Sequence, residues 1–297
     1  MNKLKSFRIP YGISILKFII LSCAFYTLYI KIHNFQIPLP KIPLLEILMI
    51  TFLSFCNWGL EVFKWQILVR SIRYISYSTA FSQSLAAHTT AIITPNKIGE
   101  YGAKASFFKK ELRKKILSLT FIGNASQMLI TCIFGCVGIA LFKFKILNHS
   151  SVLFISIFCV LGITVLYYLQ KTKNIFKYFY NTRLSTHVTV LILSLLRYLV
   201  FSFQYVFLLK IIGIEQSYTS LLPIVWLLYF ISSCIPSFAL FDFAIKGSVA
   251  LFIFDPFNIS NEIILITAFL MWLLNFAIPA IIGGFFITGF NLNQQLK

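Results

Sequence analysis

Acidic residues are scarce in this chain, which has 8 Asp and Glu among 297 residues. They form no Asp-x-x-Asp pattern, and no His-x-x-Glu pattern is present. Enzymes that act on a metal-bound or pyrophosphate-linked lipid usually need several acids, or an acid and a histidine, converging on one site. The sequence therefore argues against an enzyme of this kind. We expect no catalytic residues, no metal and no other cofactor.

Long polar segments are also lacking, because only 11% of the residues are charged. The most polar stretch, around 104–115, is too short to build the core of a soluble domain. Hydrophobic residues make up 59% of the chain, and six apolar runs reach the ~20 residues that cross a bilayer. This composition excludes a soluble enzyme fold or a nucleic-acid-binding module. It predicts an all-α polytopic membrane protein with one integral membrane domain over 1–297.

The six cysteines offer no metal site. All of them lie inside apolar segments, and Cys132 and Cys136 share a helix face without a histidine or acid at metal-ligand spacing. We therefore expect them to be small buried residues.

The distribution of basic residues predicts the topology. We expect full spans at 13–31, 44–69, 116–142, 151–170, 188–211 and 262–287. The first of these is expected to be a transmembrane helix rather than a cleavable signal, because no small-residue cleavage pattern follows it. Fifteen of the 26 Lys and Arg then fall on one side of the membrane, five on the other and six within the membrane. The excess marks the cytoplasmic side, which places both termini in the cytoplasm. Clusters such as Lys109–Lys115 are expected to orient the protein and contact anionic headgroups.

Two further apolar segments are interrupted by proline. Segment 80–108 breaks at Thr94-Pro95, and segment 219–254 breaks at Ile235-Pro236. Proline ends a preceding helix, and each half is too short for an ordinary span. We interpret both segments as re-entrant helical hairpins, which are tolerated at membrane depth where protein or a water-filled cavity satisfies the broken backbone.

The two hairpins share a sequence pattern. An acid follows the proline by five or six residues, a lysine follows the acid by four, and a small residue and a serine come next. The spans that flank the two hairpins run in opposite directions. The sequence thus predicts an inverted repeat, with repeat 1 at about 44–142 and repeat 2 at about 188–287. Transporters built this way bind substrate where their broken helices meet, near the bilayer midplane.

The charged residues of the hairpins are the main candidates for a substrate site. A charge at the bilayer centre costs about 3 kcal/mol, which suggests that Lys104 and Lys246 serve a purpose such as binding a lipid phosphate. Alternatively, each lysine only neutralises Glu100 or Asp242, which lies four residues earlier on the same helix face. The two acids could equally bind a cationic headgroup or a proton.

Residues outside these pairs complete the predicted site. Arg197 suits a phosphate because its guanidinium donates two parallel hydrogen bonds. Glu61 either faces a cavity or pairs with Lys64. We also place the hairpin breaks at the site, and they are Thr94, Pro95 and Pro236. His88 is expected to be a buried, hydrogen-bonded histidine.

The motif Pro95–Glu100 resembles a known family when it is read together with the preceding span and its Asn57, Trp58, Glu61, Lys64 and Trp65. It is similar to the transmembrane region of lysylphosphatidylglycerol synthases, the flippase-like family, and the resemblance extends over about 13–287. It implies flipping of anionic or aminoacylated phospholipids, or of polyprenyl-linked lipids, in a bacterial cytoplasmic membrane.

The chain departs from that family in three places. Many members carry arginine where this chain has Lys104 and Lys246, and Ser237–Phe241 replaces a usually glycine-rich segment. Residues 1–297 contain no segment that resembles the soluble aminoacyl-transferase domain of the bifunctional members. We therefore expect no lipid aminoacylation by this chain alone.

Three functions stay open from the sequence. The first is a lipid translocator whose partner is a membrane phospholipid or polyprenyl-linked lipid. The second is a membrane-embedded transferase or hydrolase for a lipid-linked substrate. The third is a scaffold for a separate membrane or cytoplasmic enzyme.

Overall fold

The computed structural model describes residues 42–92, 94, 97–141, 182–235, 241–257 and 259–289. Within these ranges every regular element is a helix, so the all-α prediction is confirmed for this part of the chain. The predicted spans 13–31 and 151–170 lie outside the described residues, and so do Pro95 and Pro236.

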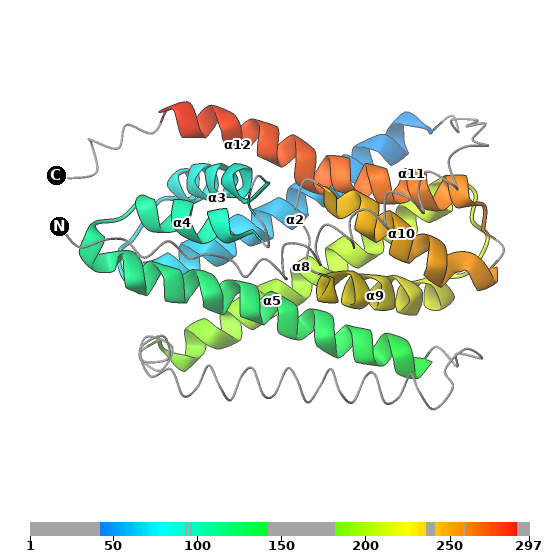
Figure 1. The fold of residues 1–297 in the computed structure, drawn as a ribbon, viewed down its shortest axis with the longest axis horizontal. Coiled ribbons are helices and arrows are strands. Elements are labelled where there is room, and N and C mark those ends of the chain that lie inside the picture. The colour runs from blue at the N-terminus through cyan, green and yellow to red at the C-terminus, as the bar shows by residue number, and fades with distance from the viewer. Residues whose placement is uncertain are drawn as a thin grey trace, which may run out of the picture.

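Four helical segments are long and apolar enough to cross a membrane. They are α2 (Leu44–Arg70), η1 with α5 (Lys110–Leu112 and Arg113–Leu141), α8 (Leu184–Ile211), and the continuous run of α11 (Asn261–Trp272), η4 (Leu273–Ala277) and α12 (Ile278–Gly289). Each overlaps a span that the sequence predicts, and its ends differ from the predicted ones by no more than six residues. All of them extend along the long direction of the molecule in Figure 1.

The outward faces of these helices are apolar. Large exposed hydrophobic side chains include Phe55 on α2, Leu129 on α5, Leu184 on α8 and Phe285 on α12. So many exposed large apolar side chains are unusual in water and suit the hydrocarbon of a bilayer. Together with the four membrane-length segments, it identifies an all-α membrane protein.

The first interrupted segment folds as a helical hairpin of α3 (Tyr77–Ile92) and α4 (Ile98–Ser106). Gly99 allows the close approach of its two helices, because a Cβ atom there would lie 2.2 Å from the carbonyl oxygen of Thr90. The Thr94 hydroxyl accepts a hydrogen bond from Gly99 N at 2.8 Å. Lys97, just before α4, has a left-handed backbone with φ of 57°.

The second interrupted segment consists of α9 (Tyr218–Cys234) and α10 (Asp242–Phe254), followed by η3 (Asp255–Phe257). Ser217 caps α9 by accepting a hydrogen bond from Ser220 N. The predicted helix–break–helix pattern is therefore confirmed for both segments, while their re-entry into the membrane stays a prediction.

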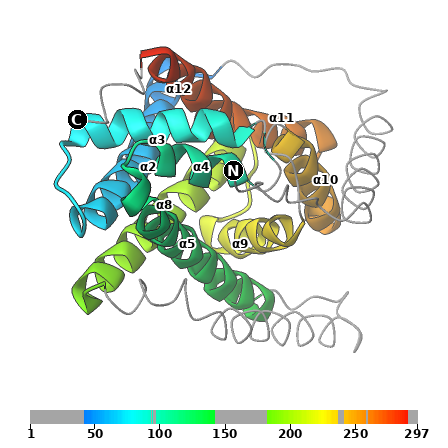
Figure 2. The same ribbon diagram turned by 60° about the vertical axis from the view of Figure 1, so that its left-hand side comes forward.

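Each hairpin packs on a long helix from the other half of the chain. Helix α3 lies against α12, and α9 lies against α5, as Figures 1 and 2 show. Both contacts use glycine: a Cβ atom on Gly283 would lie 2.1 Å from Leu85 O, and one on Gly135 would lie 2.4 Å from the Phe230 side chain. Helices α2 and α8 pack on each other between the hairpins.

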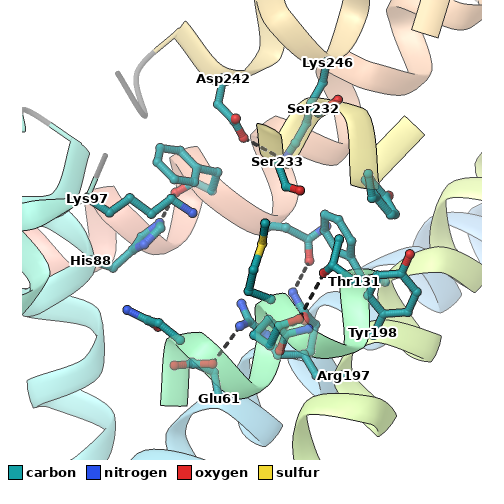
Figure 3. Close-up of a pocket in the computed structure, with 18 of the residues that line it drawn as sticks. Glu61, His88, Lys97, Thr131, Arg197, Tyr198, Ser232, Ser233, Asp242 and Lys246 are labelled. Atoms are coloured by element: carbon teal, nitrogen blue, oxygen red, sulfur yellow. Dashed lines mark hydrogen bonds and ion pairs between the residues drawn. The ribbon is translucent and has the colours of Figure 1, made fainter. Parts of the chain in front are cut away.

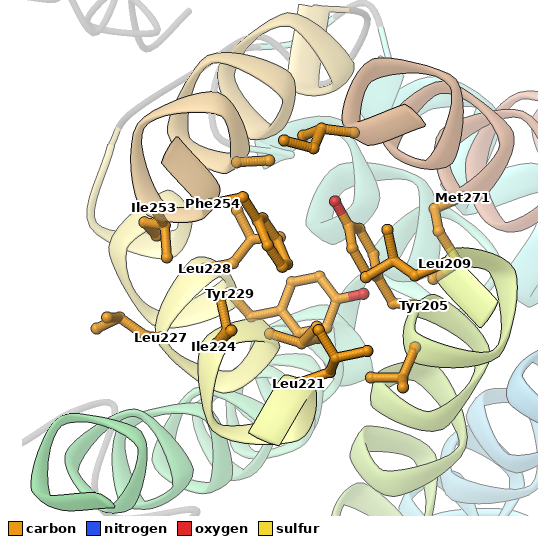
Figure 4. Packing of buried hydrophobic residues seen from close by; sticks show 14 of the residues in the cluster. Tyr205, Leu209, Leu221, Ile224, Leu227, Leu228, Tyr229, Ile253, Phe254 and Met271 are labelled. Carbon is orange, nitrogen blue, oxygen red and sulfur yellow. The ribbon is translucent and has the colours of Figure 1, made fainter. Parts of the chain in front are cut away.

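Two clusters of buried hydrophobic side chains support this arrangement. The larger one draws mainly on α8, α9, α10 and α11, and its centre is drawn in Figure 4. The smaller one draws mainly on α2 and α5. Polar and charged side chains line part of the space that the hairpins and long helices enclose.

Candidate functional site

A cavity of about 720 Å³ lies among the hairpins and the long helices. Both halves of the chain line it, and Figure 3 shows their side chains surrounding one space. The charged residues in its wall are Glu61, Lys97, Glu100, Lys104, Arg197, Asp242 and Lys246. Six of these seven are site residues that the sequence predicts, and the structure brings them together.

Each hairpin contributes an ion pair within one helix. Lys104 Nζ lies 2.7 Å from Glu100 Oε1 on α4, and Lys246 Nζ lies 2.6 Å from Asp242 Oδ2 on α10. The predicted pairing at i, i+4 is confirmed. Because each acid occupies the first turn of its helix, it also meets the positive end of the helix dipole. The chain's own carboxylates thus neutralise both helix starts.

A third acid connects the two central helices. Glu61 Oε2 lies 2.7 Å from Lys64 Nζ on the same helix and 2.7 Å from Arg197 Nη1 on α8. Arg197 Nε also donates to Asn57 Oδ1 at 3.0 Å. The two readings of Glu61 therefore hold together, since it pairs with Lys64 and also lines the cavity.

A chain of amide side chains continues from this cluster. Asn57 Nδ2 donates to Asn275 Oδ1 at 2.8 Å, and Asn275 Nδ2 donates to Gln204 Oε1 at 2.9 Å. Asn275 lies in the π-helical segment η4, four residues before Pro279, which has no N–H to bond the Asn275 carbonyl. That carbonyl instead accepts from Trp58 Nε1 at 3.1 Å. Sequence reasoning missed this chain, although an amide inside an apolar run is a signal for it.

His88 is hydrogen-bonded, as the sequence predicts, but it is only partly buried. Its Nε2 lies 3.2 Å from the carbonyl oxygen of Phe276. Its ring meets Trp58 and Phe276 edge-on, with centroids 4.8 and 4.5 Å away. The contacts fix α3 against α2 and η4 at the cavity wall.

The cations differ sharply in their accessibility. The side chains of Lys64 and Lys104 are only 2% and 4% exposed, whereas those of Arg197 and Lys246 are 25% and 28% exposed. Lys97 is exposed and has no carboxylate within ion-pair distance among the described residues. A molecule in the cavity therefore meets Lys97, Arg197 and Lys246, whereas Lys104 is almost fully buried, paired with Glu100 and packed over the Trp65 ring.

Sequence reasoning did not select Lys97 for the site. Segment 97–104 holds two lysines for one acid, which is the signal that could have found it. Thr94 was selected, but it is not among the residues that line the cavity. Its hydroxyl bonds the backbone at the hairpin tip, where it joins the end of α3 to the start of α4.

The described side chains leave the cavity with an excess of positive charge. With every group in its ordinary charge state, four cations and three acids line it, and Lys64 adds one more cation behind Glu61, which gives a net charge of +2. Across the ranges described, no group of three or more His, Cys, Asp or Glu side chains is placed to hold a metal ion.

Comparison with known protein families, with curated proteins and with solved structures found no match.

Proposed function

We propose that this protein is a lipid translocator of a bacterial cytoplasmic membrane. Its substrate is an anionic or headgroup-modified phospholipid, or a polyprenyl-linked lipid. The observation that carries the proposal is the cavity of about 720 Å³, which has a net positive charge and lies among helices long and apolar enough to span a membrane.

The charge of the cavity favours an anionic group. A charged side chain inside a membrane is costly and is usually retained for a functional reason. Lys97, Arg197 and Lys246 are the accessible cations; Lys97 lies just before α4, Arg197 on α8 and Lys246 on α10. A phosphate bound among them would contact both hairpins and a central helix at once. Such a ligand would compensate the net charge of +2 that the described groups leave in the cavity.

Each hairpin packs on a long helix of the other half of the chain, and this reciprocal packing supports the predicted inverted repeat. Helix α3 packs on α12 in the same way that α9 packs on α5, and α2 pairs with α8. Transporters with inverted repeats open to each side by rocking one unit against the other around a fixed site. Motion of the two hairpins relative to the long helices would then expose the cavity to each leaflet in turn.

The test is lipid translocation in proteoliposomes. Acyl-labelled anionic and zwitterionic lipids are followed by quenching from outside, with wild type compared against Lys97→Gln. This variant removes an accessible cation without leaving a paired acid behind, so we expect normal folding and about tenfold slower transport of anionic lipid, the effect of one lost charge-assisted hydrogen bond.

The control is Arg183→Gln, which also removes one positive charge but at an exposed position outside the cavity. It should transport at the wild-type rate. Equal rates for Lys97→Gln and Arg183→Gln would contradict the proposed role of the cavity.

A further inference from the structure

The last membrane-length segment changes its packing partners halfway along. Helix α11 packs on α10 and α8, whereas α12 packs on α3 of the first hairpin, as Figure 2 shows. The contact of α12 with α3 is close, because a Cβ atom on Gly283 would lie 2.1 Å from Leu85 O. The Thr89 hydroxyl also donates to Ala280 O at 2.7 Å. Helices α3, α4 and α12 therefore form one unit, the first body, while α11 belongs with α10 and α8.

The π-helical segment η4 joins the first body to α11. A π turn holds one residue more than an α-helical turn, and such turns mark bends and functional positions in long helices. Side chains of two other helices bond its carbonyl oxygens. Trp58 Nε1 donates to Asn275 O at 3.1 Å, and His88 Nε2 lies 3.2 Å from Phe276 O. Because Pro279 offers no N–H, the backbone hydrogen bonds are interrupted here, and the segment bends more easily at η4 than elsewhere.

The side chain of Asn275 connects this joint to Arg197. Arginine can only donate, so Asn57 presents Oδ1 to Arg197 Nε and donates its own Nδ2 to Asn275. Asn275 donates in turn to Gln204 Oε1, and Gln204 donates to Ser54 Oγ. Reversing any one amide would set two donors or two acceptors against each other. The guanidinium thus fixes the direction of the whole chain of hydrogen bonds, which holds η4 in its present bend.

We propose that η4 is a hinge between the first body and α11, and that Asn275 is the positioning residue that couples this hinge to Arg197. An anion in the cavity competes with Asn57 for the guanidinium, which is 25% exposed. Loss of that hydrogen bond frees the amides to reverse, so the restraint on η4 weakens and the first body moves relative to α10 and α11. This inference rests on the proposed anion binding and adds the device that converts binding into movement.

The experiment measures distances between spin labels in the full chain in vesicles, by double electron–electron resonance. The labels are attached to cysteines at exposed positions, in a background whose six native cysteines are replaced by alanine. One pair crosses the hinge and uses Phe285→Cys on α12 and Phe252→Cys on α10, where the native residues are 74% and 73% exposed. The other pair lies within the first body and uses Phe285→Cys with Tyr77→Cys on α3.

In vesicles of phosphatidylcholine alone, we expect two distances across the hinge and a single distance within the first body. Phosphatidic acid added to the vesicles should change the ratio of the two populations by about fivefold or more, the usual size of coupling between two sites. The comparison of the two pairs uses unaltered buried amides, so it does not depend on the folding of any variant in the hydrogen-bond chain.

Asn275→Leu tests the coupling. It should still show two distances across the hinge but lose the response to phosphatidic acid. Dioctanoyl phosphatidic acid should nevertheless protect it from thermal unfolding as it protects wild type, because Arg197 keeps its place beside Glu61. The matched control is Asn124→Leu, the same change at a cavity residue whose amide donates to Tyr101 instead. It should respond to phosphatidic acid like wild type.

A single distance across the hinge in both kinds of vesicle would overturn the inference. An equal response in Asn275→Leu and wild type would also overturn it, because Asn275 would then serve stability alone. Protection by dioctanoyl phosphatidic acid without a change in the populations would refute the coupling and leave the anion site standing. Two distances across the hinge with neither protection nor response would contradict the proposed anion binding and support the hinge alone.

Discussion

Glu61 balances two cations at once, which makes it the most informative position for stability. Its carboxylate lies 2.7 Å from both Lys64 and Arg197, and the Lys64 side chain is only 2% exposed. Glu61→Gln keeps the shape of the side chain but leaves Lys64 buried without a counter-charge. Removing one partner of a buried pair costs about 3–5 kcal/mol.

The companion variants separate a charge effect from a packing effect. Lys64→Met removes the buried cation and leaves Glu61 paired with Arg197, so we expect a much smaller loss of stability than for Glu61→Gln. The double variant Glu61→Gln/Lys64→Met should recover much of the stability lost by Glu61→Gln, since no orphaned lysine remains.

Thermal unfolding in detergent, followed by tryptophan fluorescence, measures the effect. A loss of 3–5 kcal/mol should lower the midpoint on the order of 10 °C. Glu111→Gln makes the same change at an exposed site and should stay within about 0.5 kcal/mol of wild type. The reasoning is refuted if Glu61→Gln behaves like Glu111→Gln, or if Lys64→Met destabilises more than Glu61→Gln.

The remaining predictions concern glycines at helix contacts. Gly283→Ala should destabilise strongly, because the new Cβ would lie 2.1 Å from Leu85 O, whereas Gly284→Ala meets nothing closer than 4.0 Å and should be tolerated. Gly99→Ala should open the first hairpin, because its Cβ would lie 2.2 Å from a backbone oxygen of α3. Gly102→Ala, on the same helix with nothing within 4 Å, should stabilise by roughly 0.5–1 kcal/mol. The described packing would be contradicted if Gly283→Ala and Gly284→Ala had the same unfolding midpoint. The same holds for Gly99→Ala and Gly102→Ala.

The parts of the fold that depend on local sequence could be predicted. Length and hydropathy locate four long helices within a few residues, because a bilayer sets the length of an apolar run. Proline locates the hairpin breaks, and i, i+4 spacing fixes the pairs Glu100–Lys104 and Asp242–Lys246.

The parts of the site that depend on long-range contacts could not be predicted from the sequence. Glu61 and Arg197 are 136 positions apart, and their ion pair follows from the packing of α2 on α8. Tyr205 and Tyr229 carry no sequence signal, since aromatic residues make up 17% of the chain. Only the folded structure shows that their oxygens are buried without a hydrogen-bond partner among the described residues.

The most direct test of the central claim is side-resolved lipid movement by the wild-type protein in vesicles that contain one copy each. We predict that labelled anionic phospholipid becomes accessible to an external quencher beyond the outer-leaflet fraction, and faster than in protein-free vesicles. Anionic lipid that stays confined to its original leaflet, with correctly folded protein in the same vesicles, would contradict the account.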